Sequence, residues 1–237
     1  MRNYFPEKLL SLCSGTVLIA LLILPAAPAG AAQPAFKDCS GDQQTEISQA
    51  LANARTLATR SAAYLRGVEK PQRSYDGPYA TWFGAYDAWR YTRVIAQFDT
   101  LKRALAEETI RFDCTCATHA LGDEYVLDPD KPYDVSLCSV FWERPLAGAN
   151  SRAGAVLEAM SRFTAVLGAA ETGGSQSESM ALATENPSEA IKAAPNYRHF
   201  AEEEKEAGGE HLAGALALIA LLLLVARARR KPTARHA

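Results

Sequence analysis

The residues best placed to do chemistry lie in one stretch, residues 150–171, which reads NSRAGAVLEAMSRFTAVLGAAE. Its apolar residues recur at helical spacing, so Glu158 and Arg162, four positions apart, are expected on one face of a helix. Glu158 and Glu171 carry oxygen atoms that can bind a metal ion, whereas Arg162 is permanently charged and would repel one. The stretch therefore favours an acid–base pair over a metal site.

Other candidate chemistry is sparse. Ser151 and Ser161 have no histidine at a predictable distance, and His119 and His199 are too far apart in sequence to form a helical pair. Five aromatic residues could line a peptide groove, although aromatic residues in such blocks more often belong to a core. They are Trp82, Phe83, Tyr86, Trp89 and Trp142.

The N-terminal segment is predicted to direct export. In residues 1–32, Arg2 and Lys8 come first, an apolar run follows, and small residues close the segment. This order is typical of a cleaved signal peptide, the alternative being an uncleaved membrane anchor.

The C-terminal segment is predicted to meet the membrane. Residues 212–226 are unbroken apolar sequence, and the basic tail 227–237 follows them. A transmembrane helix with a cytoplasmic tail fits this pattern. The order of Gly208 and Gly209, apolar helix and arginine cluster is also similar to bacterial surface-protein sorting signals, from which the helix is removed. Residues 205–211 would be a linker.

The remaining residues, 33–204, are predicted to form a single domain with a sizeable core. Residues 33–226, which include the predicted linker and apolar segment, carry 18 basic and 26 acidic side chains, a net charge of about −8. This negative charge argues against nucleic acid as a partner. A role in keeping the protein soluble is enough to explain it.

Four cysteines belong to this domain, and in an exported chain they predict two disulfides with three possible connectivities. Cys114 and Cys116 are too close to bond readily to each other, so each is expected to pair with either Cys39 or Cys138. A metal-binding cysteine cluster is the alternative, which an oxidising compartment disfavours.

The hydrophobic spacing predicts a mainly helical α+β domain with a small β-sheet. Helices are expected at residues 43–66, 91–105, 150–168, 176–185 and 196–206, and strands at 110–116, 124–127 and 134–140.

An ordered set of short motifs runs across the domain. The set comprises Cys39, the block Tyr79…Trp82-Phe83-Gly84…Tyr86, Phe112-x-Cys114-x-Cys116, Pro132-Tyr133, Leu137-Cys138, Phe141-Trp142, Ser151-Arg152-Ala153-Gly154, Phe163-Thr164-Ala165-Val166, Leu182-Ala183, Asn186-Pro187 and Asn196-Tyr197…Phe200. In this order it resembles the deuterolysin or aspzincin metalloendopeptidases, most closely their peptidyl-lysine-cleaving branch. The resemblance implies a zincin-like fold and the disulfides Cys39–Cys114 and Cys116–Cys138.

The resemblance also implies a zinc site that this sequence has altered. In that family an H-E-x-x-H helix supplies two zinc ligands and a general base, a later Asp is the third ligand, and a Tyr stabilises the transition state. Here the two histidine ligand positions hold Glu158 and Arg162, and the general-base position holds Ala159. Glu171 stands at the position of the Asp ligand, and Gly174 at that of the Tyr. The acidic residues associated with lysine selectivity correspond to Pro195 and Arg198.

These differences predict a protein without zinc or another cofactor and without catalysis, because a missing general base alone costs about 10²–10⁴-fold in rate. We expect an exported, membrane-anchored protein of the cell envelope that binds a peptide or protein in the former substrate cleft. The alternatives are an active zinc metalloendopeptidase with rearranged ligands and a structural surface protein.

Arg162 is expected to occupy the place of the ion, bonded to Glu158 and with Glu171 as a second partner. The alternative is a solvated surface pair worth about 0.3–0.5 kcal/mol.

Overall fold

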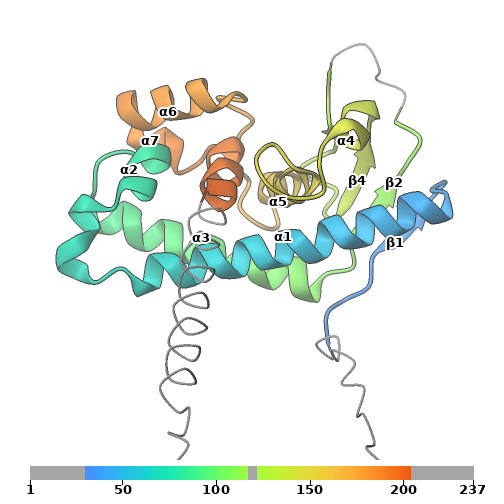
Figure 1. Ribbon diagram of the computed structural model, residues 1–237, viewed down its shortest axis with the longest axis horizontal. Coiled ribbons are helices and arrows are strands. Elements are labelled where there is room, and N and C mark those ends of the chain that lie inside the picture. Colours follow the sequence, from blue (N-terminus) through green and yellow to red (C-terminus); the bar gives the residue numbers. More distant parts are fainter. Residues whose placement is uncertain (1–29, 117–121, 204–237) are drawn as a thin grey trace, which may run out of the picture.

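Two long antiparallel helices form the base of the molecule, α1 (Gly41–Gly67) and α3 (Ala88–Glu107) (Figure 1). They belong to a computed structural model that describes residues 30–116 and 122–203. α1 begins where Ser40 and Gln43 each accept the backbone N–H of the other, which satisfies two free donors. Both predicted helices are confirmed and extend slightly beyond their predicted ends.

A four-stranded sheet lies at one end of this helix pair (Figure 1). The strand order is β1-β2-β4-β3, with β1, β2 and β4 parallel and β3 antiparallel to β4. The strands are β1 (Ala35–Lys37), β2 (Arg111–Asp113), β3 (Tyr125–Val126) and β4 (Asp134–Leu137). The three predicted strands are therefore present but shorter, and β1 was not expected because three residues show too little alternation.

The aromatic block Tyr79…Tyr86 begins in a short helix and ends in the segment that follows it. η1 (Lys70–Tyr75) leads into α2 (Gly77–Phe83), which ends at Gly84. Gly84 has φ +81°, and a Cβ there would lie 2.2 Å from the Ala183 carbonyl oxygen, so the position requires glycine. Trp82 and Phe83 are buried, so for these two residues the core interpretation is confirmed.

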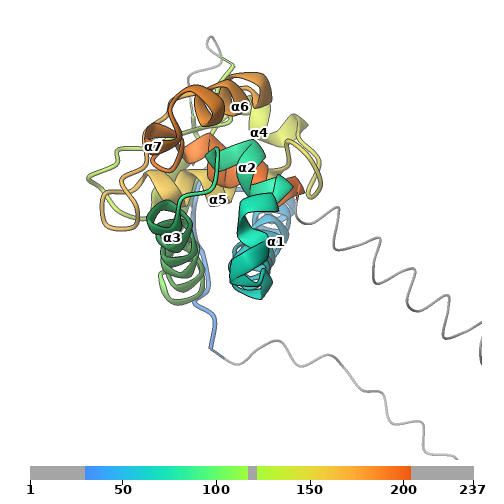
Figure 2. The ribbon, with the colours of Figure 1, turned by 90° about the vertical axis from the view of Figure 1, so that its left-hand side faces the viewer.

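A second layer of helices crosses the base (Figure 2). α5 lies over α1 and α3, beside the helical residues 194–203. The other helices of this part are short, and the predicted helix at 176–185 is confirmed with the same ends. The elements are α4 (Ser139–Glu143), α5 (Arg152–Arg162), α6 (Gln176–Glu185) and α7 (Pro187–Ala190).

The prediction that the helix of α5 continues to residue 168 is wrong. Phe163 leaves the helical conformation with ψ 131°, and its carbonyl oxygen then accepts the N–H groups of the turn that ends at Gly168. Thr164 N–H donates to the Pro129 carbonyl instead of continuing the helix. A tertiary hydrogen bond and the burial of the Phe163 ring thus outweigh the helical spacing of the apolar residues.

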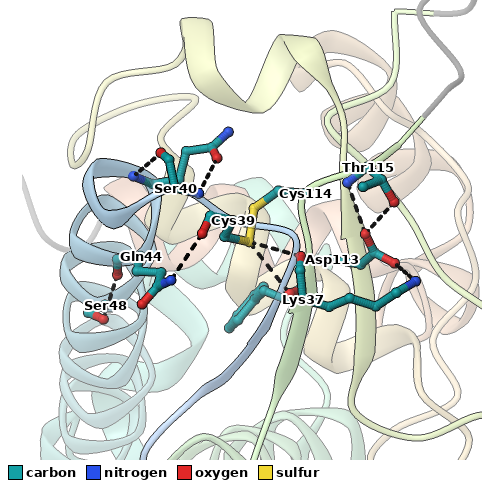
Figure 3. The surroundings of a disulfide bond; sticks show 10 residues. Lys37, Cys39, Ser40, Gln44, Ser48, Asp113, Cys114 and Thr115 are labelled. Carbon is teal, nitrogen blue, oxygen red and sulfur yellow. Dashed lines mark hydrogen bonds and ion pairs between the residues drawn. A yellow bond between two sulfur atoms is a disulfide. The ribbon is translucent and has the colours of Figure 1, made fainter.

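Two disulfides join the sheet to its surroundings, with the pairing that the resemblance implied. Cys39–Cys114 holds the start of α1 against β2, and the Cys39 carbonyl also accepts a hydrogen bond from Gln44 (Figure 3). Cys116–Cys138 joins the segment after β2 to the residue that follows β4. Disulfides of this kind are typical of proteins that fold outside the reducing cytosol.

The predicted targeting segments lie almost wholly outside the described residues. Only residues 30–32 of the expected signal peptide are described; the linker at 205–211, the apolar segment 212–226 and the basic tail 227–237 are not. Within residues 30–116 and 122–203, no helix is both long and apolar enough to cross a membrane.

Candidate functional site

The helix with the candidate residues is held in place at its N-terminus by polar contacts. Ser151 is the N-cap of α5, and its hydroxyl oxygen accepts the N–H of Gly154 at 3.0 Å. The Glu202 carboxylate accepts the backbone N–H groups of Asn150 and Ser151 at 2.9 and 2.8 Å. A negative charge at this end of a helix is stabilised by the helix dipole.

Small residues let neighbouring elements approach α5 closely. A Cβ on Gly154 would lie 1.9 Å from the nearer Glu202 carboxylate oxygen, so glycine is what admits this contact. Every residue of α5 from Arg152 to Ser161 is buried. The helix is therefore fixed by packing on all sides, and its polar residues must find partners within the protein.

Glu158 finds its partners on two other segments. Its carboxylate accepts the Tyr125 hydroxyl at 3.0 Å, and Arg198 Nη1 lies 3.2 Å from the other oxygen. Burial raises the pKa of Glu158 above its ordinary value, while Arg198 acts in the opposite direction. The predicted bond between Glu158 and Arg162 is wrong, because Arg198 is the cation that faces this carboxylate.

Arg198 also binds a second carboxylate. Its Nη1 lies 2.6 Å from Glu124 Oε2, and Glu124 Oε1 accepts the Nε–H of Arg144 at 2.5 Å. Glu124 and Tyr125, next to each other at the start of β3, were not singled out by sequence reasoning. In the sequence, the only local indication of these ion pairs was that Arg198 and Glu202 are four residues apart, which places them on one face of a helix.

Arg162 takes the other expected partner. Its Nη2 lies 2.6 Å from Glu171 Oε2, and its guanidinium carbon lies 5.5 Å from the centre of the Tyr125 ring. The ion pair joins the end of α5 to the segment after it, as expected. It reaches the surface, because the Glu171 side chain is 60% exposed.

The remaining candidate positions carry no reactive group. Ala159 is 1% exposed and has no proton-accepting atom. Gly174 is exposed, and nothing lies within 4 Å of where its Cβ would be. Pro195, the other position associated with lysine selectivity, is buried.

The two serines are structural. Ser151 caps α5 and its hydroxyl donates to Glu202, while the Ser161 hydroxyl donates to the Glu158 carbonyl at 2.6 Å. His119 lies outside the described residues. Neither serine therefore has a histidine as hydrogen-bond partner among the described residues.

His199, next to Arg198 in the chain, is the one histidine among residues 30–116 and 122–203. It is 3% exposed and packs on Trp82 with ring centres 5.0 Å apart. Burial, reinforced by the neighbouring charge of Arg198, lowers the pKa of His199 to about 4. The ring is therefore neutral at physiological pH.

The other aromatic candidates do not form one groove. Trp89 is 64% exposed at the start of α3, whereas Trp142 lies at the end of α4 with its ring edge-on to Phe141. The structure thus separates residues that the sequence could only group by type.

The family is shown by a family model for lysine-specific metallo-endopeptidases, the aspzincins, which matches residues 69–202. The chain belongs to this family. An extracellular protease of Aeromonas hydrophila is 37% identical over 164 residues, covering 69% of this chain and 45% of that protein. A peptidyl-Lys metalloendopeptidase of Pleurotus ostreatus is 32% identical over 167 residues, covering 70% of this chain and 95% of that protein.

A solved structure of a zinc peptidase agrees with the fold. The zinc peptidase from Grifola frondosa superimposes with a TM-score of 0.64 at 28% identity, covering 70% of this chain and 98% of that one. The chain spans about half the length of the A. hydrophila protein and of a peptidyl-Lys metalloendopeptidase of Armillaria mellea, of which 46% is matched. The mainly helical α+β fold of the family is therefore present here.

The residues that the resemblance assigns to the zinc ligand positions do not fit zinc. A zinc site needs nitrogen, sulfur or oxygen ligands that converge on one point. Here Glu158 is bonded to Tyr125 and Arg198, and Arg162 is a cation that is bonded to Glu171. Among residues 30–116 and 122–203, no three His, Cys, Asp or Glu side chains are grouped so that they could hold a metal ion.

Proposed function

We propose that this aspzincin is catalytically inactive and acts by binding a peptide or protein. The observation that carries the proposal is that arginine ion pairs take up both acidic residues at the metal-ligand positions. Glu158 is paired with Arg198, and Glu171 is paired with Arg162. In a working member, zinc would activate water and polarise the peptide carbonyl; neither Ala159 nor Gly174 can assist that chemistry.

A groove beside the former site offers a surface for binding. It has a volume of about 300 Å³, follows directly on Glu171 and lies between the segment at Thr172 and one face of α6. Its lining combines the apolar residues Ala181 and Leu182 with the acidic residues Glu178 and Glu185, and Thr172 and Gly173 complete it. Such a surface suits an extended polypeptide with apolar and basic residues. Because Arg198 fills the position associated with lysine selectivity, we expect no preference for lysine itself.

We further propose that the protein is exported and anchored in the membrane by residues 212–226. The two disulfides support export. The apolar segment, followed by the basic tail 227–237, supports an anchor with its tail in the cytoplasm. Protease digestion of intact cells tests this arrangement: the domain should be degraded, and a tag on the tail should be protected.

Zinc content and cleavage, measured on one sample, test the loss of activity. The exported protein, with both disulfides intact, is analysed for metal and incubated with a denatured lysine-rich protein, with and without EDTA. We expect substoichiometric zinc and no cleavage, with an active peptidyl-Lys metalloendopeptidase as positive control. Stoichiometric zinc together with EDTA-sensitive cleavage would overturn the proposal and favour rearranged zinc ligands.

Binding is tested separately with two matched variants of α6. Leu182→Arg changes the lining of the groove, whereas Thr184→Arg adds the same charge at an exposed position outside the lining. We expect Leu182→Arg alone to weaken binding of unfolded polypeptides. Equal binding by both variants would place the binding surface outside the groove. No binding even by the wild type would favour a purely structural surface protein, an alternative that the complete burial of residues 152–161 supports.

A further inference from the structure

One guanidinium lies at the centre of the buried charges beside α5. The Arg198 side chain is 8% exposed, and its nitrogen atoms face three carboxylates. Nη1 lies 2.6 Å from Glu124 and 3.2 Å from Glu158, and Nε lies 3.6 Å from Glu202. The three carboxylate side chains are 10%, 11% and 3% exposed. Water therefore cannot readily replace any of these contacts.

The carboxylates come from segments that are far apart in the sequence. Glu124 precedes β3, Glu158 belongs to α5, and Glu202 shares the terminal helical segment with Arg198. Glu202 in turn binds the N-terminus of α5 through Asn150 and Ser151. A single cation thus connects the sheet, the helix at the family's metal position and the end of the domain.

The arrangement is suited to a guanidinium and not to a metal ion. A guanidinium has five N–H donors spread over a planar fork, so its partners can lie well apart around its edge. A metal ion needs ligands that converge within about 2.0–2.6 Å. In the described part of the chain, no three acidic or histidine side chains are arranged in that way.

We propose that Glu124, Glu158 and Glu202 form a cation site whose permanent occupant is the protein's own Arg198. In this site Arg198 serves as the cross-link between the three segments, so the folded state needs no metal. An arginine never loses its proton in a protein, so the site keeps its cation at every physiological pH. The proposal concerns the stability of the domain and does not depend on peptide binding in the groove.

Chemical rescue tests the proposal. Arg198→Ala in the full-length, oxidised protein leaves three carboxylates without their cation, and we expect its Tm to fall by roughly 6–20 °C. Guanidinium chloride at about 50 mM, too dilute to denature appreciably, should raise the Tm of this variant relative to equal sodium chloride. Arg111→Ala is the control, since its ion pair with Asp134 is exposed and leaves no enclosed site. The wild-type Tm should not respond to EDTA.

A suppressor variant separates charge from packing. Arg198→Ala combined with Glu124→Gln and Glu158→Gln removes two of the three buried negative charges but leaves the same gap in packing. We expect this triple variant to regain a large part of the lost Tm, even where Arg198→Ala alone fails to fold.

Three results would overturn the proposal. A Tm of Arg198→Ala equal to that of the wild type would show that the cation is dispensable. A triple variant no more stable than Arg198→Ala would assign Arg198 a packing role only. A wild-type Tm that falls in EDTA would show that a metal stabilises the domain.

Discussion

The two ion pairs at the positions that the resemblance assigns to zinc ligands differ mainly in burial. The Glu158 and Arg198 side chains are 11% and 8% exposed, whereas Arg162 and Glu171 are 15% and 60% exposed. A buried pair cannot lose one member without leaving a bare charge inside the protein. An exposed pair loses little, because water solvates the remaining member. We therefore expect the Glu158–Arg198 pair to contribute substantially to the stability of the domain, and the Arg162–Glu171 pair to contribute little.

The largest effect is expected from Glu124→Ala, which breaks the buried side of the comparison. It leaves Arg198 without its shortest ion-pair contact, so the free energy of unfolding should fall by about 3–5 kcal/mol. Urea denaturation measures the change. Asp134→Ala, which removes half of an exposed pair, is the control and should cost less than about 1 kcal/mol. Equal costs for the two variants would contradict the difference in burial.

A pH dependence is expected from His199, which lies beside the buried cluster. Its folded pKa of about 4 is below the ordinary value of 6.5, so the unfolded chain binds the extra proton first. The stabilisation is complete above pH 6.5 and is lost as the pH falls towards 4, by up to about 3 kcal/mol.

His199→Phe keeps an aromatic ring on Trp82 and removes the titration. The difference in unfolding free energy between wild type and variant should therefore change between pH 7 and pH 4. The contribution of Glu158, whose raised pKa acts in the opposite direction, is present in both proteins and largely cancels. A difference that stays constant with pH would mean that His199 is not a buried neutral ring.

A smaller effect is expected from Gly154→Ala, which disturbs the contact between Glu202 of the buried cluster and the N-terminus of α5. The new methyl group would overlap the Glu202 carboxylate, so the variant should lose roughly 1–3 kcal/mol of stability. Gly174→Ala is a matched control, because nothing lies within 4 Å of its added carbon. If both variants unfold at the same urea concentration, the contact between Glu202 and α5 is looser than described.

The smallest effect is expected from Glu171→Ala, on the exposed side of the comparison. Because this carboxylate is largely solvated, its removal should cost about 0–1 kcal/mol. Glu171→Gln, which keeps the shape, should cost no more. A loss above about 2 kcal/mol in both variants would show that the Arg162–Glu171 cross-link stabilises the domain in its own right.

The helical part of the fold was largely predictable from the sequence. α1, α3 and α6 follow apolar spacing, and α1 and α6 also carry capping boxes that mark where they begin. The end of α5 was not predictable, because the apolar spacing continues through Phe163. A distant hydrogen bond, from Thr164 to Pro129, and the burial of the Phe163 ring end the helix there.

The sequence by itself determined the family and the pairing of each cysteine in Cys114-x-Cys116 with one of the other two. These properties are set by residue identity and order along the chain. Only the tertiary structure decided which charges meet. Glu158 had a favourable local partner in Arg162, yet it pairs with Arg198, forty positions away. Burial explains this choice, since α5 is enclosed at Glu158 and the nearest cation inside the protein comes from another helix.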